Sequence, residues 1–378
     1  MTKINDVVPF DAIKLLQTLV SMDSCDPPGH EVDIAKLLHA ELLAHGIDAE
    51  LDEFLPGRAN VLGCVKGKGT KPALVLSAHL DTVPVASSLW SFPPFSGAAE
   101  DGRILGRGSS DMKSAVAAMV AAAIQIRYRP APLQGDLILA FSAGESSNCL
   151  GAKRFVELGL RKRMGALLVG EPSSMDVIVA EKAVLWLRVG AQGRLGHVSG
   201  DPGVNAIDIM VDFLKLLKEV RLSHEAHPLL DGPTIRVGLI EGGSAVNLTP
   251  DSCFAEIDVR FAPKITSDEV LQAIRNIAPS EISIIVSDFK PSVESSPDSP
   301  FVHLCTVICE QAIGRKPTIK GVSYYSDAAV LSAGLDIPFA IVGPGDLGMS
   351  GQSNESVSIS NVLAAAVVYQ QIAEKWLE

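Results

Sequence analysis

The sequence predicts an α/β protein in which a doubly wound mixed sheet is interrupted by an inserted, ferredoxin-like α+β domain. Short apolar runs alternate with amphipathic helical stretches in residues 1–179 and again in residues 289–378, as in chains that build one sheet. Residues 180–288 instead follow the order strand, helix, strand, strand, helix, strand, which is typical of a ferredoxin-like module. The sheet domain is therefore expected to be discontinuous, with the Ser- and Pro-rich residues 291–300 as the return linker.

In the sheet domain, apolar residues at helical spacing and short β-rich runs mark the elements in order. Two helices open the chain around the turn-forming sequence Asp-Pro-Pro-Gly at 26–29. A later alanine-rich stretch is predicted as a helix, and the apolar runs around it as buried strands. The expected helices are residues 10–20, 31–45 and 114–127, and the expected strands are residues 60–65, 73–78, 136–142, 166–169 and 339–342.

The inserted domain shows the same two periodicities in a different order. Alternating or apolar runs predict strands, and apolar residues three or four apart predict helices. The expected strands are residues 185–190, 234–240, 254–261 and 282–286, and the expected helices are residues 206–220 and 267–277.

Length and composition restrict the class of protein. A chain of 378 residues is long enough for two or three packing units. A net charge of −12, with 47% apolar and 20% charged residues, argues against disorder and against a nucleic-acid partner. No apolar run approaches the ~20 residues that cross a bilayer, and the start of the chain lacks an export signal, so we expect a cytoplasmic protein with no membrane partner. Most of the six cysteines are expected to be buried apolar residues rather than zinc ligands.

The run SAHLDTVPV places His79 and Asp81 at the end of an apolar strand, on one face of it. An imidazole at a strand end can bind a metal ion, and a carboxylate behind the ring can fix its tautomer. The alternative is a strand-end pair that only caps a turn.

Three further acids also lie at the ends of predicted elements. Asp111 precedes the alanine-rich helix, and Glu145 and Glu171 each follow an apolar strand. Taken singly, Asp111 could be a helix cap and the others solvated loop acids. Carboxyl ends of strands in a doubly wound sheet are where such folds place their sites, so the four positions together indicate one site.

These residues and the motifs around them resemble a known family, the metal-dependent amidohydrolases and exopeptidases that include acetylornithine deacetylase, succinyl-diaminopimelate desuccinylase, carboxypeptidase G and aminoacylase. The resemblance covers nearly the whole chain, and the order and spacing of the motifs both match. The motifs are SAHLDTVPV, Trp90 with PPF at 93–95, GRGSSDMK, GEPSS, GRLGHVSGDPGVNAI, GGSAVNLTP, DVRF, YSDAAVL, GPGD and NES.

The resemblance implies a role for each residue of the predicted site. His79 would bind a metal ion, Asp111 would bridge, and Glu171 would complete the shell of the first ion. Asp81 would orient His79, and Glu145 matches the general base that deprotonates the attacking water. The chain is therefore expected to be a hydrolase of a C–N bond.

The inserted domain matches the lid or dimerisation domain of the family, so the resemblance also implies a homodimer. His197 matches a histidine that stabilises the oxyanion, often in the site of the partner subunit. Asn247 and Arg260 match positions that hold the substrate carboxylate in some members. A surface position for His197 and a strand-end ion pair for Arg260 are the alternatives.

Two departures from the family pattern fall on ligands of the second metal ion. Ser146 stands where the family has an acid directly after the base, and Gln352 where it has a histidine before the Asn-Glu pair. Hydroxyl and carboxamide groups are poorer ligands, so we expect one ion per chain, zinc or manganese, with cobalt as an in vitro substitute. Gln352 would then hydrogen-bond the substrate or bind the ion through its oxygen.

The leading hypothesis is thus a single-metal amidohydrolase that acts on a small carboxylate-bearing molecule such as an N-acyl amino acid or a dipeptide. Two alternatives stay open at this point. The altered centre could hydrolyse a less usual C–N bond, such as an amine on a ring, or the chain could be a non-catalytic binder on the same fold.

Overall fold

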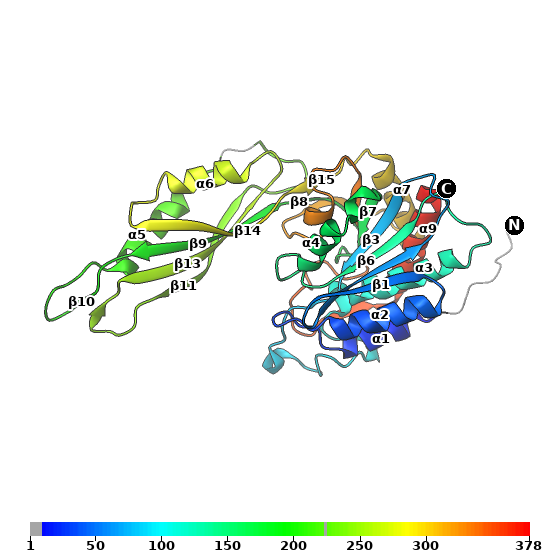
Figure 1. The fold of residues 1–378 in the computed structure, drawn as a ribbon, viewed down its shortest axis with the longest axis horizontal. Coiled ribbons are helices and arrows are strands. Elements are labelled where there is room, and N and C mark those ends of the chain that lie inside the picture. Colours follow the sequence, from blue (N-terminus) through cyan, green and yellow to red (C-terminus); the bar gives the residue numbers. More distant parts are fainter. Residues whose placement is uncertain (1–9, 223–224) are drawn as a thin grey trace. The chain divides into compact units, whose positions relative to one another are not determined.

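The structure is a computed structural model that describes residues 10–222 and 225–378 (Figure 1). The chain divides into two compact units. The first comprises the described residues up to Val179 together with residues 294–320 and 326–378, and the second comprises residues 180–293 and 321–325. The predicted mixed α/β fold class is confirmed.

The first unit is built on a nine-stranded mixed sheet with the order β1-β2-β6-β3-β7-β17-β8-β15, in which β16 pairs with β8. The central strands β6, β3, β7 and β17 run parallel, whereas β1, β2 and β8 join antiparallel. The strands are β1 Asp48–Leu55, β2 Arg58–Val65, β3 Ala73–His79, β6 Leu137–Ser142, β7 Met164–Val169, β8 Val177–Glu181, β15 Val293–Glu294, β16 Ile319–Val322 and β17 Phe339–Ile341.

The parallel strands lie at the centre because they are apolar on both faces. Every residue of β3 and of β6 is buried, which suits strands covered by helices on both sides. The polar side chains of β3 and β6 lie toward their carboxyl ends: Ser77 and His79 on β3, and Ser142 on β6. His79 is the last residue of β3, and its position follows from this pattern.

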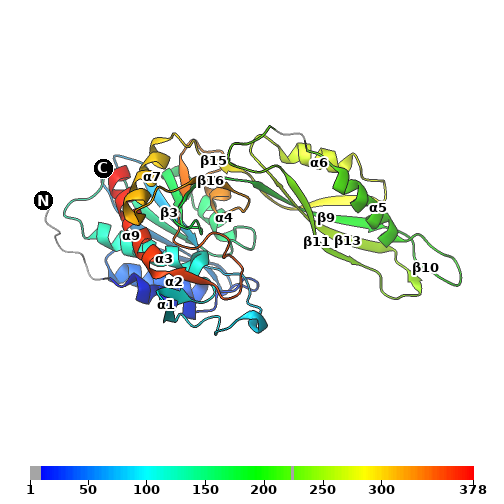
Figure 2. The ribbon, with the colours of Figure 1, turned by 180° about the vertical axis from the view of Figure 1, so that it is seen from behind.

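Helices cover the sheet of the first unit. The alanine-rich α3 is buried along almost its whole length and packs against α9, which also contacts α7 and α1. These helices lie in front of the sheet in Figure 2, seen from behind relative to Figure 1, whereas α4 packs with α8. The helices are α1 Ala12–Ser21, α2 Val32–Ala44, α3 Ser114–Arg127, α4 Leu150–Glu157, α7 Pro300–Ile313, α8 Ala328–Leu331 and α9 Ile359–Leu377. A small separate sheet is formed by β4 Ala99–Glu100, β5 Arg103–Leu105 and β18 Ser356–Ser358.

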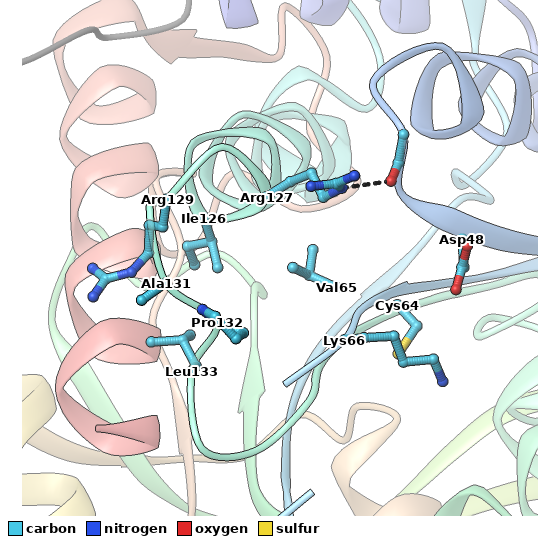
Figure 3. Close-up of a pocket in the computed structure, with 11 residues that line it drawn as sticks. Asp48, Cys64, Val65, Lys66, Ile126, Arg127, Arg129, Ala131, Pro132 and Leu133 are labelled. Atoms are coloured by element: carbon cyan, nitrogen blue, oxygen red, sulfur yellow. Dashed lines mark hydrogen bonds between the residues drawn. The ribbon is translucent and has the colours of Figure 1, made fainter. Parts of the chain in front are cut away.

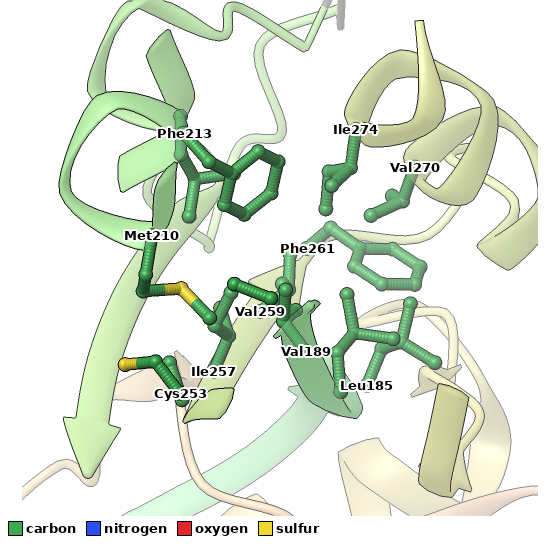
Figure 4. Packing of buried hydrophobic residues seen from close by; sticks show 14 of the residues in the cluster. Leu185, Val189, Met210, Phe213, Cys253, Ile257, Val259, Phe261, Val270 and Ile274 are labelled. Atoms are coloured by element: carbon green, nitrogen blue, oxygen red, sulfur yellow. The ribbon is translucent and has the colours of Figure 1, made fainter. Parts of the chain in front are cut away.

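The second unit is an antiparallel four-stranded sheet, order β11-β13-β9-β14, with two helices. Its elements follow the predicted order: β9 Ala183–Gln192, α5 Ala206–Glu219, β11 Thr234–Gly242, β13 Ser252–Phe261, α6 Ser267–Arg275 and β14 Ile282–Lys290, with β10 Gly196–His197 and β12 Leu248–Thr249 as a short extra pair. Alternate residues of β9 and β13 meet apolar side chains of both helices in one core, as Figure 4 shows for Phe213 of α5 and Ile274 of α6. Thr266 and Glu269 form a capping box at the start of α6.

The sequence prediction and the structure differ in a few elements. The prediction omitted β1, an edge strand in which four acids are mixed with apolar residues and no residue is fully buried. It also omitted the strands β8 and β16 of the main sheet and the helices α4, α8 and α9. Residues 291–300, expected as a linker, contain β15, and Pro300 begins α7.

The return to the first unit falls at 293/294 rather than at 288/289, because β14 continues to Lys290. Residues 321–325 also belong to the second unit, where Tyr325 packs edge-on against Trp186 with 6.2 Å between the ring centroids. Within the described residues, no helix is both long enough and apolar enough to cross a membrane.

Candidate active site

His79 is held at the carboxyl end of β3 with its ring almost fully buried. Its Nδ1 lies 2.9 Å from the backbone carbonyl oxygen of Asp81. A carbonyl can only accept, so Nδ1 carries a proton, and Nε2 is the ring nitrogen that is available to a metal ion. Nε2 lies 3.1 Å from Oδ1 of Asp111 and 3.6 Å from Oε1 of Glu171.

The carboxylates around this ring make the position attractive to a cation. Burial by itself lowers the pKa of His79, but the charges of Glu171, Asp111 and Asp81 outweigh it and raise that pKa well above its ordinary value. A field that favours a proton on Nε2 also favours a divalent ion in front of it.

Asp111 is fixed by a carboxylate from the other end of the chain. It lies in the segment Ser109–Lys113 that leads into α3. Oε1 of the fully buried Glu355 accepts hydrogen bonds from the backbone N–H groups of Ser110, at 2.8 Å, and Asp111, at 3.0 Å. Oε2 of Glu355 pairs with Arg107 at 2.6 Å. This network positions the backbone of Asp111 independently of any bound ion.

The three residues His79, Asp111 and Glu171 fit a divalent metal ion. Their ligand atoms all lie within 4.8 Å of one another. Ligands at about 2.0–2.1 Å from a tetrahedral zinc ion stand about 3.3 Å apart, and the two distances from Nε2 lie close to this value. One imidazole and two carboxylates also suit manganese.

A second group of three acids, Asp26, Glu31 and Asp81, lies nearby, but it already holds a cation. The guanidinium of Arg58 is 2.6 Å from Asp26 and 2.7 Å from Glu31. A fixed positive charge at this point disfavours a metal ion in the same place.

The loop that carries Glu145 is held by side chains that accept hydrogen bonds from four successive backbone N–H groups. Asn60 accepts from residue 143 at 3.0 Å, and Glu31 from residue 144 at 3.1 Å. The carboxylate of Asp81 accepts from Glu145 and from Ser146, each at 3.0 Å. Burial fixes these acceptors, so the backbone of the base is positioned before any substrate binds.

The role that the sequence suggests for Asp81 differs from the contact it makes. We expected its carboxylate to orient the ring of His79, but the backbone carbonyl of Asp81 makes that contact. Its carboxylate lies 3.7 Å from Nδ1 and instead holds the loop of Glu145. The spacing of two residues allows both arrangements, so the sequence could not distinguish them.

Two acids next to the predicted metal ligands have pKa values above the ordinary range. Burial raises the pKa of Glu145 well above its ordinary value, and the charges of Asp81 and Asp327 add to the effect, although His79 opposes it. Burial also raises the pKa of Asp327 to about 6, while a hydrogen bond from the Ser142 hydroxyl lowers it in part. Raised pKa values of this kind are typical of proton-transfer groups.

The two residues that depart from the family pattern lie in the loops around the site. Ser146 follows the base, and its backbone binds Asp81. Gln352 is exposed, and its backbone carbonyl accepts a hydrogen bond from Arg107 at 3.2 Å; the described residues include no partner for its carboxamide. The side chain of this loop that reaches a predicted ligand is Ser350, whose hydroxyl donates to Oδ2 of Asp111.

Sequence reasoning missed Ser350, and it quoted Glu355 and Asp327 only as parts of the motifs NES and YSDAAVL. Both acids are almost completely buried, so they contribute to the site from inside the protein. No local pattern marks Ser350, which contacts a residue 239 positions away.

The predicted residues of the inserted domain lie in the second unit. His197 and Asn247 are in contact, with 3.2 Å between Nε2 and the carboxamide. Nδ1 of His197 accepts a hydrogen bond from the backbone N–H of Ser199 at 3.2 Å and lies 2.7 Å from the hydroxyl of Ser199.

Arg260 is engaged within the second unit. It donates two hydrogen bonds to Asp258, at 2.9 and 3.1 Å, and one to the carbonyl of Ser323 at 2.7 Å. The strand-end ion pair that the sequence left open is thus present. Since a guanidinium has five N–H groups, two remain for a substrate.

A separate cavity of about 290 Å³ lies between the β1–β2 edge and the end of α3 (Figure 3). Its basic side chains are already engaged: Arg127 donates to the carbonyl of Gly46 at 2.7 Å, Arg129 pairs with Glu374 at 2.7 Å, and Lys66 lies 3.9 Å from Asp136. None of the predicted site residues lines this cavity.

The sequence matches a family model. The model described as peptidase family M20/M25/M40 matches residues 75–375. A protein of Staphylococcus epidermidis named probable succinyl-diaminopimelate desuccinylase is 27% identical over 401 residues, covering 97% of this chain and 98% of its own. An acetylornithine deacetylase of Vibrio cholerae is 27% identical over 382 residues, covering 97% of each chain.

Solved structures share the fold. An M20 family metallo-carboxypeptidase from Sulfolobus solfataricus superposes with a TM-score of 0.81 at 18% identity, covering 97% of this chain and 99% of its own. A dinuclear metal-binding peptidase of the M20 family from Bacillus subtilis gives a TM-score of 0.74 at 16% identity, covering 97% of both chains.

Proposed function

This chain belongs to peptidase family M20/M25/M40 and is a metal-dependent hydrolase of amide bonds, and we propose that it acts on a small carboxylate-bearing substrate with a single metal ion. The substrate class follows from relatives named for desuccinylation and deacetylation, and an N-acyl amino acid or a dipeptide is the form we favour. The observation that carries the proposal is the cluster of His79, Asp111 and Glu171 beside the rigidly held loop of Glu145.

The donor set supports one ion rather than two. Within residues 10–222 and 225–378, the ligand atoms at this position that all lie within 4.8 Å of one another come from His79, Asp111 and Glu171. Ser146 and Gln352 replace the two ligands that the family pattern would supply to a second ion. Zinc and manganese both suit one imidazole and two carboxylates, with cobalt as a useful probe.

Each residue of the site then has a defined task. A divalent ion bound by His79, Asp111 and Glu171 would polarise the amide carbonyl and lower the pKa of water. Glu145 would take the proton of the attacking water and deliver it to the leaving amine. Asp81 would keep Glu145 in place through the two backbone hydrogen bonds of its carboxylate.

Glu145 is suited to both halves of this proton transfer. Its buried position raises its pKa, so the carboxylate is more basic than an exposed one, and the acid it becomes is still strong enough to protonate an amine. A non-catalytic binder would have no use for a base held by this network of buried acceptors.

Other parts of the proposal depend on the family resemblance. Stabilisation of the oxyanion by His197, substrate binding by Asn247, Arg260 and Gln352, a homodimer through the inserted domain and a cytoplasmic location stay predictions. The two remaining N–H groups of Arg260 are compatible with binding of a substrate carboxylate.

A screen of N-acyl amino acids and dipeptides with zinc, manganese and cobalt tests the proposed function. We expect turnover with at least one pair of substrate and metal. Glu145→Gln should retain the ion but lose turnover by 10²–10⁴-fold, the usual contribution of a general base. The matched control is Glu157→Gln on α4, where 66% of the glutamate side chain is exposed. Equal activity of the two variants would refute the role of Glu145.

A further inference from the structure

The carboxylate of Asp111 makes a different contact through each of its oxygens. Oδ1 lies 3.1 Å from Nε2 of His79 and faces the predicted ion. Oδ2 accepts a hydrogen bond from the hydroxyl of Ser350. A carboxylate that bridges two metal ions needs both oxygens for the ions, so the hydrogen bond from Ser350 engages the atom that a second ion would require.

The loop that carries Ser350 is held in place by the segment that carries Asp111. The loop before Ser350 is anchored where the Ser110 hydroxyl accepts a hydrogen bond from the backbone N–H of Asp346 at 2.8 Å. The loop after it is anchored where Arg107 donates to the carbonyl of Gln352 at 3.2 Å. Because Ser110 and Arg107 lie within four residues of Asp111, the two ends of the Ser350 loop are tied to the Asp111 segment.

A close approach of backbone adds to this fixation. A side chain at Gly345 would bring its Cβ within 2.1 Å of the carbonyl oxygen of Ser110. Only glycine therefore fits where the loop crosses the Asp111 segment. The backbone on both sides of Ser350 is therefore held against the Asp111 segment, and the exposed side chain of Ser350 lies within hydrogen-bond distance of Asp111.

We propose that Ser350 is a positioning residue that restricts this centre to one metal ion. Its hydroxyl does so by donating a hydrogen bond to Oδ2 of Asp111. This inference rests on the proposed single-metal function. Ser146 and Gln352 stand in place of two ligands of a second ion, whereas Ser350 acts on Asp111, the carboxylate that would bridge the two ions. A second ion would have to displace a hydrogen bond to a charged acceptor before it could bind.

The size of the effect follows from that displacement. Hydrogen bonds to charged groups contribute enough to stability that their loss changes an equilibrium by roughly tenfold or more. We therefore expect a second ion to bind at least tenfold more tightly when the hydroxyl of Ser350 is absent, provided that another ligand is supplied.

The test compares full-length Ser146→Glu, which supplies a carboxylate next to the base, with the double variant Ser146→Glu/Ser350→Ala. The control for the loop is Ser146→Glu/Ser353→Ala. Cobalt is titrated into each metal-free protein, and the number and affinity of the bound ions are read from the visible absorption and from elemental analysis. Circular dichroism shows that each variant is folded.

We expect the variant with Ser350→Ala to bind the second cobalt ion at least tenfold more tightly than both other proteins. Equal affinities in the three proteins, or no second ion in any of them, would overturn the role of Ser350. Loss of the first ion in the folded Ser350→Ala variant would also overturn it, because the hydroxyl would then serve the first ion. Two tight ions in the unsubstituted protein would instead contradict the proposed function.

Discussion

Replacement of Asp81 by asparagine distinguishes two explanations of the Asp81 carboxylate: that it orients His79, or that it holds the loop of Glu145. If the carboxylate of Asp81 oriented His79, its removal would weaken metal binding by 10–100-fold, as for other carboxylates behind a ligating histidine. In the structure the backbone carbonyl makes that contact, and the carboxylate binds the N–H groups of Glu145 and Ser146. Asp81→Asn leaves the carbonyl in place, so we expect metal affinity to change less than tenfold.

The cost should appear in stability and turnover instead. Asparagine offers one acceptor oxygen and turns an NH₂ group toward the second N–H, so one charged hydrogen bond is lost and the other becomes neutral. Hydrogen bonds to charged groups contribute about 1.5–3 kcal/mol and neutral ones about 1 kcal/mol. Removing a buried negative charge beside Glu145 offsets part of this loss. We expect the free energy of unfolding to fall by about 2 kcal/mol and kcat to fall by about 10²-fold as the base loses its position.

Three measurements check this account: urea denaturation of the metal-free protein, chelator competition for the ion, and kcat on the substrate found by screening. The control is Asp33→Asn, since 75% of the Asp33 side chain is exposed, and it should match the unsubstituted protein in all three. A large loss of metal affinity in Asp81→Asn with an unchanged kcat of the fully loaded enzyme would refute the reasoning.

Three further predictions concern stability. Burial lowers the pKa of Lys113 to about 8, so between pH 8 and 10.5 this residue binds more protons in the unfolded chain and its contribution to stability rises by about 3 kcal/mol. Burial raises the pKa of Cys305 and Cys309, which acts in the opposite direction, so the measured quantity is the difference between the unsubstituted protein and Lys113→Met in urea denaturation. That difference should change by about 3 kcal/mol across this range, and a constant difference would contradict the prediction. Glu355→Ala leaves Arg107 buried without its partner and should cost about 3–5 kcal/mol in the same assay, whereas a loss below 1 kcal/mol would contradict the network. Removal of the ion by a chelator should lower the melting temperature, because an ion at 1,000 times its Kd stabilises the fold by about 4 kcal/mol; an unchanged melting temperature would argue against tight binding.

Two elements that the sequence predicted well are buried along almost their whole length. The strand that ends at His79 and the helix that follows Asp111 are mostly apolar, so their type and position follow from composition and length. The edge strand β1 has no such pattern, since it pairs on one side only and carries charged residues on both faces. Its strand character comes from pairing with β2, which the local sequence does not display.

The same distinction applies to the candidate site. His79, Asp111, Glu145 and Glu171 lie at the ends of predicted elements, and a doubly wound sheet brings such ends together. The contacts that hold them were beyond prediction, because they join residues far apart in the chain: Glu355 lies 244 positions from Asp111, and Ser350 lies 239 positions from it. Loop geometry decides these pairs, and no periodicity encodes it.

The most direct test of the central claim is the number of metal ions that one chain holds. Metal-free protein is titrated with zinc or manganese, dialysed against metal-free buffer, and assayed for bound metal per chain and for hydrolysis of its substrate. The proposed function predicts that one ion per chain remains and that activity reaches its maximum at one equivalent. Two retained ions per chain, with activity that needs the second, would contradict it.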